Sequence, residues 1–126
     1  MEHSTFTPKL LNELFPTERS NEFFDALYGD PNEGAYDIRL AFHGRKGKTL
    51  NFSLDLHQRS GKCLACNLTY GLPEVFSRHP VINVAGLVKK IEEHLPAGKC
   101  AKWQLGSTIP IDKQLYRIPL SIIISD

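Results

Sequence analysis

Histidines, carboxylates and a serine recur at every second position in two stretches of the chain, residues 35–43 and 49–57. The polar residues with this spacing are Asp37, Arg39, His43, Asn51, Ser53, Asp55 and His57, and Asn67 follows in the next stretch. Alternate side chains of a strand point to the same side of a sheet, so these residues should share one polar face. We interpret that face as a surface for a partner or ligand, with a plain solvated face as the alternative.

Two more residues are added to this candidate surface from a connecting stretch, residues 71–81. The stretch carries a proline near each end and is long for a connection. The chain direction through the predicted strands places Arg78 and His79 at one end of the sheet, beside a basic hairpin turn at residues 45–48. We therefore expect Arg78 and His79 to border the polar face.

Two groupings on the polar face have the residue types that nucleophilic catalysis requires. One is Ser53 with His43 and Asp55, and the other is Cys63 with His57. A catalytic nucleophile needs a base within hydrogen-bond reach and a third group that orients the base. The sequence does not identify that third group. We therefore assign no catalytic residue and keep a small enzyme as an alternative to a non-catalytic protein.

The three cysteines, Cys63, Cys66 and Cys100, raise the possibility of a metal site. Together with His57 they make a Cys₃His set, which is a common zinc ligand set. Structural zinc sites hold a C-x-x-C pair on a turn, whereas strand alternation here puts Cys66 in the core and Cys63 on the opposite face. Because of this strand geometry we predict no metal, and we predict no cofactor. The odd cysteine count argues against a disulfide framework.

Basic residues in two turns raise the possibility of nucleic-acid binding. The pattern His-x-Arg-x-Gly-Lys occurs at residues 43–48 and again at residues 57–62. Successive hairpin turns lie at opposite ends of a sheet, so the two copies cannot form one site in a monomer. The formal net charge of +1 and the lack of an aromatic stacking motif make nucleic acid the weaker alternative.

The strands that carry these side chains are predicted from apolar residues at alternate positions. Short turns with glycine and lysine separate the first three strands, which therefore form an antiparallel meander. Pro119 cannot donate a ladder hydrogen bond, so we expect the last strand to lie at an edge or to be bulged. The predicted strands are residues 35–43, 49–57, 63–70, 100–105 and 115–124.

The helices are predicted from capping residues and from apolar residues three or four positions apart. Thr7 is followed by Pro8 and caps the first helix, and a second helix starts near Thr17. Asn83 caps a third helix that ends at Leu95, just before a proline. We predict residues 71–81 to be irregular.

Size and composition indicate one globular domain over residues 1–126, with residues 1–6 as a flexible tail. Hydrophobic residues make up 41% of the chain and charged residues 23%, which is typical of a folded protein. No apolar run approaches the roughly 20 residues that a membrane span needs. The first residues lack the basic start and apolar segment of a signal peptide, so we expect a cytoplasmic protein.

The predicted fold is a single α+β domain with the order α-α-β-β-β-α-β-β. The meander extends to a mixed five-strand sheet with helices on one face. This order is similar to that of the class I secretion chaperones of bacteria, a similarity of predicted topology that transfers no residue roles. The resemblance implies a small protein-binding or chaperone-like module, which is the function we favour.

The last strand also suggests how copies of the chain meet. Ile123 is apolar on the predicted polar side, and an edge strand offers unpaired backbone groups. We therefore expect a homodimer near the C-terminal strand, with another protein as the main partner and no contact with a membrane. On a solvated face, Asp55→Ala should leave stability nearly unchanged, whereas Leu54→Ala should cost about 2–5 kcal/mol.

Overall fold

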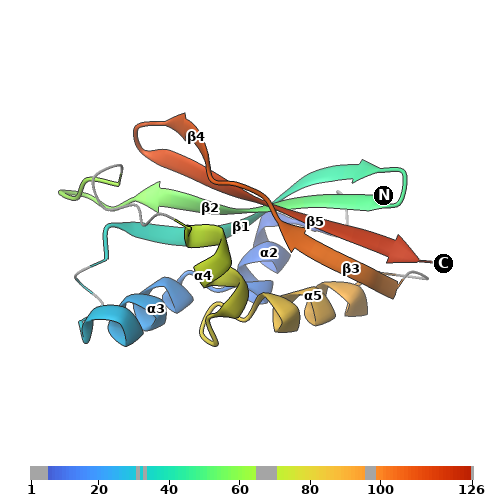
Figure 1. The fold of residues 1–126 in the computed structure, drawn as a ribbon, viewed down its shortest axis with the longest axis horizontal. Coiled ribbons are helices and arrows are strands. Elements are labelled where there is room, and N and C mark those ends of the chain that lie inside the picture. Colours follow the sequence, from blue (N-terminus) through green and yellow to red (C-terminus); the bar gives the residue numbers. More distant parts are fainter. Residues whose placement is uncertain (1–5, 31, 33, 65–70, 96–98, 126) are drawn as a thin grey trace.

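Helices cover one side of a single antiparallel sheet (Figure 1). The computed structural model describes residues 6–30, 32, 34–64, 71–95 and 99–125. The elements are α2 (Pro8–Leu14), α3 (Glu18–Tyr28), β1 (Tyr36–Lys46), β2 (Thr49–Gln58), α4 (Leu72–Arg78), α5 (Val84–Glu93), β3 (Lys99–Leu105), β4 (Ile109–Asp112) and β5 (Leu115–Ser125). The predicted α+β class, with five strands and the helices on one face, is confirmed.

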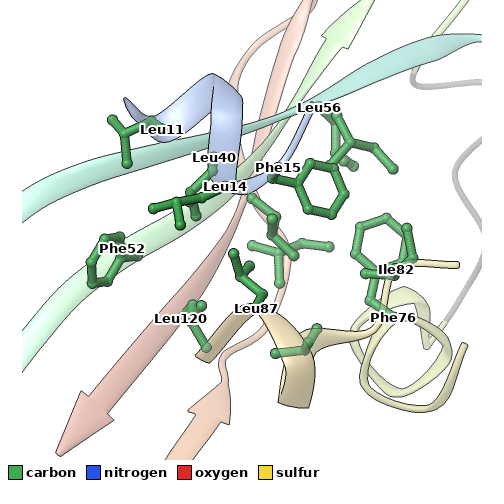
Figure 2. Packing of buried hydrophobic residues seen from close by; sticks show 14 of the residues in the cluster. Leu11, Leu14, Phe15, Leu40, Phe52, Leu56, Phe76, Ile82, Leu87 and Leu120 are labelled. Carbon is green, nitrogen blue, oxygen red and sulfur yellow. The ribbon is translucent and has the colours of Figure 1, made fainter. Parts of the chain in front are cut away.

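The core lies between the sheet and the helices (Figure 2). The apolar positions of the strands face the helices, as their alternation predicts. Side chains of this cluster that are fully buried include Phe15, Phe23, Phe52, Phe76, Ile38, Leu50, Leu54, Leu56, Ile82, Leu87 and Ile91. Burying side chains of this size contributes roughly 1.5–3 kcal/mol each, so this layer is the main source of the fold's stability.

The helix boundaries follow the capping residues in the sequence. The Thr7 side chain accepts a hydrogen bond from the Leu10 amide at the start of α2, and Asn83 caps α5 by accepting one from the Gly86 amide. Gly29 ends α3 in the left-handed conformation, with φ at 77°. These three predictions are confirmed because capping depends on local sequence alone.

The strand order differs from the predicted meander. The neighbours along the sheet are β1, β2, β5 and β3, and β4 also pairs with β5. The third meander strand was expected beside β2, but β5 occupies that place. Residues 63–64 are in a loop and a turn, and residues 65–70 lie outside the described residues. Every pairing between the described strands is antiparallel, so the predicted mixed sheet was also wrong in this detail.

Pro119 lies in a central strand, so its predicted edge position is wrong. On one side of β5, Pro119 is opposite Ser53 of β2. On the other side β3 ends opposite Leu120 and β4 begins opposite Arg117, so the proline faces the gap between them. The Pro119 carbonyl accepts a 2.8 Å hydrogen bond from the Gly106 amide there. The missing N–H costs little at this position, because no strand faces it.

The register of β1 against β2 also differs from a simple symmetric hairpin. Arg39 is directly opposite Asp55, where symmetry about residue 46 would have placed Asp37. A bulge between Phe42 and Gly44 shifts the pairing, and Gly44 has a φ of 126° that other residues rarely adopt. A bulge of one residue has no clear signal in apolar alternation, so the register could not be derived.

Three short segments were missed or misassigned. α4 was expected to be irregular and β4 to be a loop, because elements of seven and four residues show too little periodicity. Phe6 was assigned to a flexible tail, yet it is buried with its ring centroid 5.0 Å from that of Phe42. The remaining residues of the predicted tail, residues 1–5, lie outside the described residues.

Side chains from the helices reach the backbone of β1 and β3, two of the strands at the borders of the sheet. The buried hydroxyl of Ser20 in α3 accepts a 2.7 Å hydrogen bond from the Ile38 amide of β1. The Glu92 carboxylate in α5 accepts a 2.8 Å hydrogen bond from the Cys100 amide of β3. These two bonds tie the helical layer to β1 and β3.

Among the described residues, no helix has the length and apolar character needed to span a membrane.

Candidate functional site

The side of the sheet that faces away from the helices is here called the open face (Figure 1). None of the described helices covers it. Strand pairing places these residues on it: Asp37, Arg39, Ala41, His43 and Lys46 of β1; Thr49, Asn51, Ser53, Asp55 and His57 of β2; Lys102 and Gln104 of β3; and Leu115, Arg117, Pro119, Ser121 and Ile123 of β5. The polar positions of the first two predicted strands therefore do share one face.

Asp55 is the centre of a hydrogen-bonded network on this face. Its residue is only 6% exposed, although no described helix lies over it. Arg117 of β5 holds the carboxylate with two contacts, Nε to Oδ1 at 2.9 Å and Nη2 to Oδ2 at 3.2 Å. Ser53 donates from Oγ to Oδ1 at 2.6 Å. Charge-assisted and bidentate contacts are the stronger kind of protein hydrogen bond, so this carboxylate is held in one geometry.

His43 extends the network by one member. Its Nε2 lies 2.7 Å from Ser53 Oγ. The serine proton is already donated to Asp55, so His43 Nε2 must be the donor and the neutral ring carries its proton there. Burial lowers the pKa of His43 from its ordinary value, the nearby Arg117 lowers it further, and Asp55 opposes both. His43 is therefore a neutral donor at neutral pH.

This arrangement brings the predicted Ser53, His43 and Asp55 together, but in an order unlike that of a catalytic triad. In a triad the base lies between the nucleophile and the carboxylate, whereas here the serine lies between the histidine and the carboxylate. Ser53 is also fully buried. Its hydroxyl is therefore a structural donor that connects two side chains, and the geometry does not activate it as a nucleophile.

A row of three charges crosses the centre of the open face. Arg39 of β1, Asp55 of β2 and Arg117 of β5 are directly opposite one another in the sheet. Arg117 pairs with the carboxylate, while Arg39 is exposed and forms no salt bridge with any other described residue. One carboxylate between two guanidinium groups leaves a net positive charge at this point.

The next row along the sheet, formed by Asp37, His57, Leu115 and Asp112, carries two carboxylates. Arg59 donates from Nε to Asp37 Oδ1 at 3.0 Å and from Nη2 to Asn21 Oδ1 at 2.8 Å. His57 is opposite Asp37 on β2. Burial lowers the pKa of His57, Arg39 lowers it further, and the two nearby aspartates oppose the shift. This row therefore adds one neutralised carboxylate, a histidine that stays neutral near pH 7, and the exposed carboxylate of Asp112 at the border formed by β4.

The remaining candidate residues lie elsewhere. Arg78 ends α4 on the helical side of the sheet (Figure 1). The His79 ring packs 4.8 Å from that of Phe23, and its Nδ1 accepts a hydrogen bond from the Val81 amide. Their expected place beside the open face was wrong, because the stretch predicted to be irregular contains the helix α4, which ends at Arg78. Asn67 lies outside the described residues.

The possible zinc ligands are not gathered in one place. Cys63 comes five residues after Gln58, the last residue of β2, whereas Cys100 of β3 is opposite Ile124 of β5, near the level of the first residue of β2. A ten-residue strand such as β2 spans about 30 Å between these two levels. The described residues contain no group of three or more His, Cys, Asp or Glu side chains that could hold a metal ion. Cys66, the other member of the C-x-x-C motif, lies outside the described residues.

The two described cysteines differ in chemical state. Cys63 is disulfide-bonded, which the odd cysteine count did not lead us to expect. A disulfide-bonded Cys63 has no free thiol, so in this state it cannot act as a nucleophile with His57 as its base. Cys100 is a free thiol that donates to the Val88 carbonyl at 3.8 Å. Burial raises the pKa of Cys100 to about 11, with the charge and hydrogen bond of Glu92 adding to the effect.

Arg117 and Lys102 belong to the open face but were missed from the sequence. Arg117 occupies an alternate position of the last strand, as do Ser121 and Ile123. That spacing was visible, but its meaning depends on β5 pairing with β2, and local patterns do not specify the partner of a strand.

No known protein family, curated protein or solved structure that was compared with this chain matches it.

Proposed function

We propose that this chain is a non-catalytic protein-binding module, and that its open face docks an acidic segment of another protein. The observation that carries the proposal is the positive charge left over in the row of Arg39, Asp55 and Arg117 on that face. Asp55 and Asp37 are each paired with an arginine, Arg117 and Arg59, while Arg39 is exposed without an ion pair in the described part of the chain. Complementary charge is a main source of partner specificity, so the expected partner is negative.

The buried network supports this role because it holds the Arg117 guanidinium in one position before a partner binds. Arg117 is held by both oxygens of Asp55, and Asp55 is held in turn by Ser53. A preorganised side chain loses less entropy on binding than a mobile one. A sheet face whose only role is contact with solvent would not require a buried serine and aspartate held in a fixed geometry.

Exposed apolar side chains of β4 lie next to the arginines, and a partner could bury them on binding. Ile109 of β4 is opposite Arg117, and both Ile109 and Ile111 are large exposed hydrophobic residues. Arginine is one of the residue types enriched at the energetic centre of an interface, and exposed apolar side chains beside it add surface that a partner can bury. The expected partner segment is therefore acidic with apolar residues between its charges.

The cytoplasm is the location we propose, with the disulfide of Cys63 as the observation against it, since such bonds are rare there. Alkylation of thiols in intact cells, followed by mass spectrometry of the Cys63 peptide, tests the location: the thiol should be labelled without prior reduction. A homodimer stays a prediction. Its predicted route through a free edge of β5 is wrong, because β5 is paired on both sides.

Differential capture tests the proposed function. The purified chain is immobilised in three forms, wild type, Arg39→Glu and Lys89→Glu, and proteins retained from an extract of the cells that express it are quantified. Lys89 is exposed on α5, on the helical side, and its reversal makes the same charge change away from the open face. We expect one or more proteins retained by wild type and Lys89→Glu to be lost with Arg39→Glu.

Two results would contradict the proposal. One is identical retention by all three forms. The other is retention that disappears on nuclease treatment of the extract, with a steep dependence on salt, which would indicate nucleic acid as the ligand.

A further inference from the structure

A second row of open-face residues lies near the turn between β1 and β2. Strand pairing aligns Lys46 of β1, Thr49 of β2, Ile123 of β5 and Lys102 of β3 across the whole sheet. The hairpin turn, the end of β5 and the start of β3 lie at the same end of the molecule (Figure 1). The row therefore has a lysine at each border and an apolar side chain between them.

A hollow of about 310 Å³ lies within this row and the next one. Its lining residues are Thr49, Lys102, Trp103, Gln104, Ser121 and Ile123. Its size is at the lower limit of small-ligand pockets, so it suits one side chain rather than a large ligand. Ile123 provides apolar contact, and Thr49, Gln104 and Ser121 provide hydrogen-bonding groups at its border.

The charge around the hollow is positive. Lys46 and Lys102 are both exposed, and neither forms a salt bridge with another described residue. No aspartate or glutamate belongs to this row or to the adjacent row of Gly44, Asn51, Ser121 and Gln104. A partner segment with an acidic residue on either side of the hollow would therefore be attracted to these two lysines.

The spacing of the two lysines specifies the occupant. Three gaps between neighbouring strands separate Lys46 from Lys102, which is about 14 Å between their Cα atoms. An extended chain rises about 3.3 Å per residue, so residues four positions apart are about 13 Å apart. Side chains two positions apart in such a chain point to the same side, so the central one can enter the hollow.

We infer that the hollow receives an apolar side chain of an extended protein segment that crosses the open face, with an acidic residue two positions before it and another two positions after it. This inference rests on the proposed function and names the partner chemistry at one part of the same face. The acidic residues meet Lys46 and Lys102, and the apolar residue packs on Ile123.

Titration with synthetic peptides tests the inference, with amide chemical shifts of the ¹⁵N-labelled chain as the readout. The probe peptide is Gly-Glu-Ser-Leu-Ser-Glu-Gly, and the control peptide has the same composition in the order Gly-Glu-Glu-Ser-Ser-Leu-Gly. We expect the probe to bind more tightly than the control. The largest shifts should fall on Thr49, Lys102, Gln104, Ser121 and Ile123.

Protein variants then locate the contacts. Lys46→Glu and Lys102→Glu should each weaken binding of the probe about three- to tenfold, since an exposed ion pair is weak and its reversal adds repulsion. Ile123→Thr should weaken it as well. Lys113→Glu is the matched control: this exposed lysine precedes β5 at the far end of the sheet, and its reversal should leave binding within about twofold.

Equal affinity for the two peptides, or shifts confined to other residues, would overturn the inference. So would tighter binding of a 15-nucleotide oligothymidylate than of the probe, lost in Lys46→Glu and Lys102→Glu, because nucleic acid would then be the ligand of this row. If the probe fails while Arg39→Glu still loses a captured protein, the hollow is excluded as the docking point and the proposed function stands. If Arg39→Glu also captures the same proteins as wild type, both fail.

Discussion

Ser53 and Asp55, two residues apart on the open face of β2, are joined by a 2.6 Å hydrogen bond from the serine hydroxyl to the carboxylate. Both side chains are buried on a face that none of the described helices covers. Residues two apart in a strand are neighbours on one face, but their burial on an uncovered face also needs a side chain that closes over them. Arg117 does so from β5, and its contacts with Asp55 join segments 62 residues apart in the chain.

The first prediction concerns this network and reverses the expectation from sequence. Asp55→Ala should lower the free energy of unfolding by about 1–3 kcal/mol, because Ser53 and Arg117 lose a charged acceptor. Denaturant melts measure the change. Asn51→Ala, on the same strand and face, is the control and should change stability by less than about 0.5 kcal/mol. Equal losses in the two variants would mean that the network contributes nothing specific.

The second prediction concerns the core beneath it. Leu54 is fully buried on the opposite face of the same strand. Leu54→Ala should cost about 2–5 kcal/mol, since it leaves a cavity among close-packed side chains. Calorimetry should then show a lower melting temperature with a single transition. A loss well under about 1 kcal/mol would contradict the packing described for this layer.

The third prediction concerns pH. The pKa values of His43 and His57 are lowered in the folded chain from the ordinary value of 6.5. The unfolded chain therefore binds more protons as the pH falls through 6.5, and stability should decrease from that point down to the folded pKa. Melts at pH 7.5 and at pH 5 should show this decrease, and it should be smaller in His43→Gln and in His57→Gln. If the loss of stability between pH 7.5 and pH 5 were as large in both variants as in the wild type, groups other than these histidines would be its cause.

The fourth prediction concerns the free thiol. With a pKa of about 11, only about one Cys100 thiol in a thousand is ionised at pH 8, so iodoacetamide should modify it slowly in the native chain. Glu92→Gln should speed the reaction, because the amide keeps a hydrogen-bond acceptor for the Cys100 amide and removes the negative charge. Mass spectrometry of the Cys100 peptide separates this thiol from the other cysteines. Equal rates in the two forms would exclude an effect of Glu92.

The sequence predicted the layers well and the strand neighbours poorly. Alternation in β2 identified Leu50, Phe52, Leu54 and Leu56 as buried, because the side of a strand that faces the core depends on local spacing. The same alternation fits any neighbouring strand of suitable length. The partner of β2 was therefore assigned to the next stretch in the chain, and β5 was not considered.

The candidate site was recovered only in part for the same reason. Asp55 and Ser53 were found because they alternate along β2, but their burial was not expected. It depends on Arg117, whose pairing with Asp55 is a long-range property of the sheet. Arg78 and His79 were misplaced because a seven-residue helix, α4, was not recognised and the path of the chain after β2 was wrong.

The fifth prediction concerns the bond between α3 and β1. Ser20→Ala should cost about 1–3 kcal/mol, because the Ile38 amide loses the only partner that it has on that side of β1 among the described residues. Hydrogen exchange at Ile38 should become faster. Ser20→Thr keeps the hydroxyl and is the comparison for the lost acceptor. Unchanged exchange in Ser20→Ala would show that the amide is protected by other means.

The Ser20–Ile38 hydrogen bond and the corresponding Glu92–Cys100 bond affect whether further strands can add to the sheet. A β-sheet with free borders is a template on which further strands add, and repeated addition leads to fibres. Here the N–H groups of Ile38 on β1 and Cys100 on β3 are already occupied by side chains anchored in helices. An incoming strand would have to displace a group that is held by the fold. Stacking of copies border to border is opposed in this way at β1 and at β3, which leaves the short border of β4 and the broad uncovered surface of the sheet for contact.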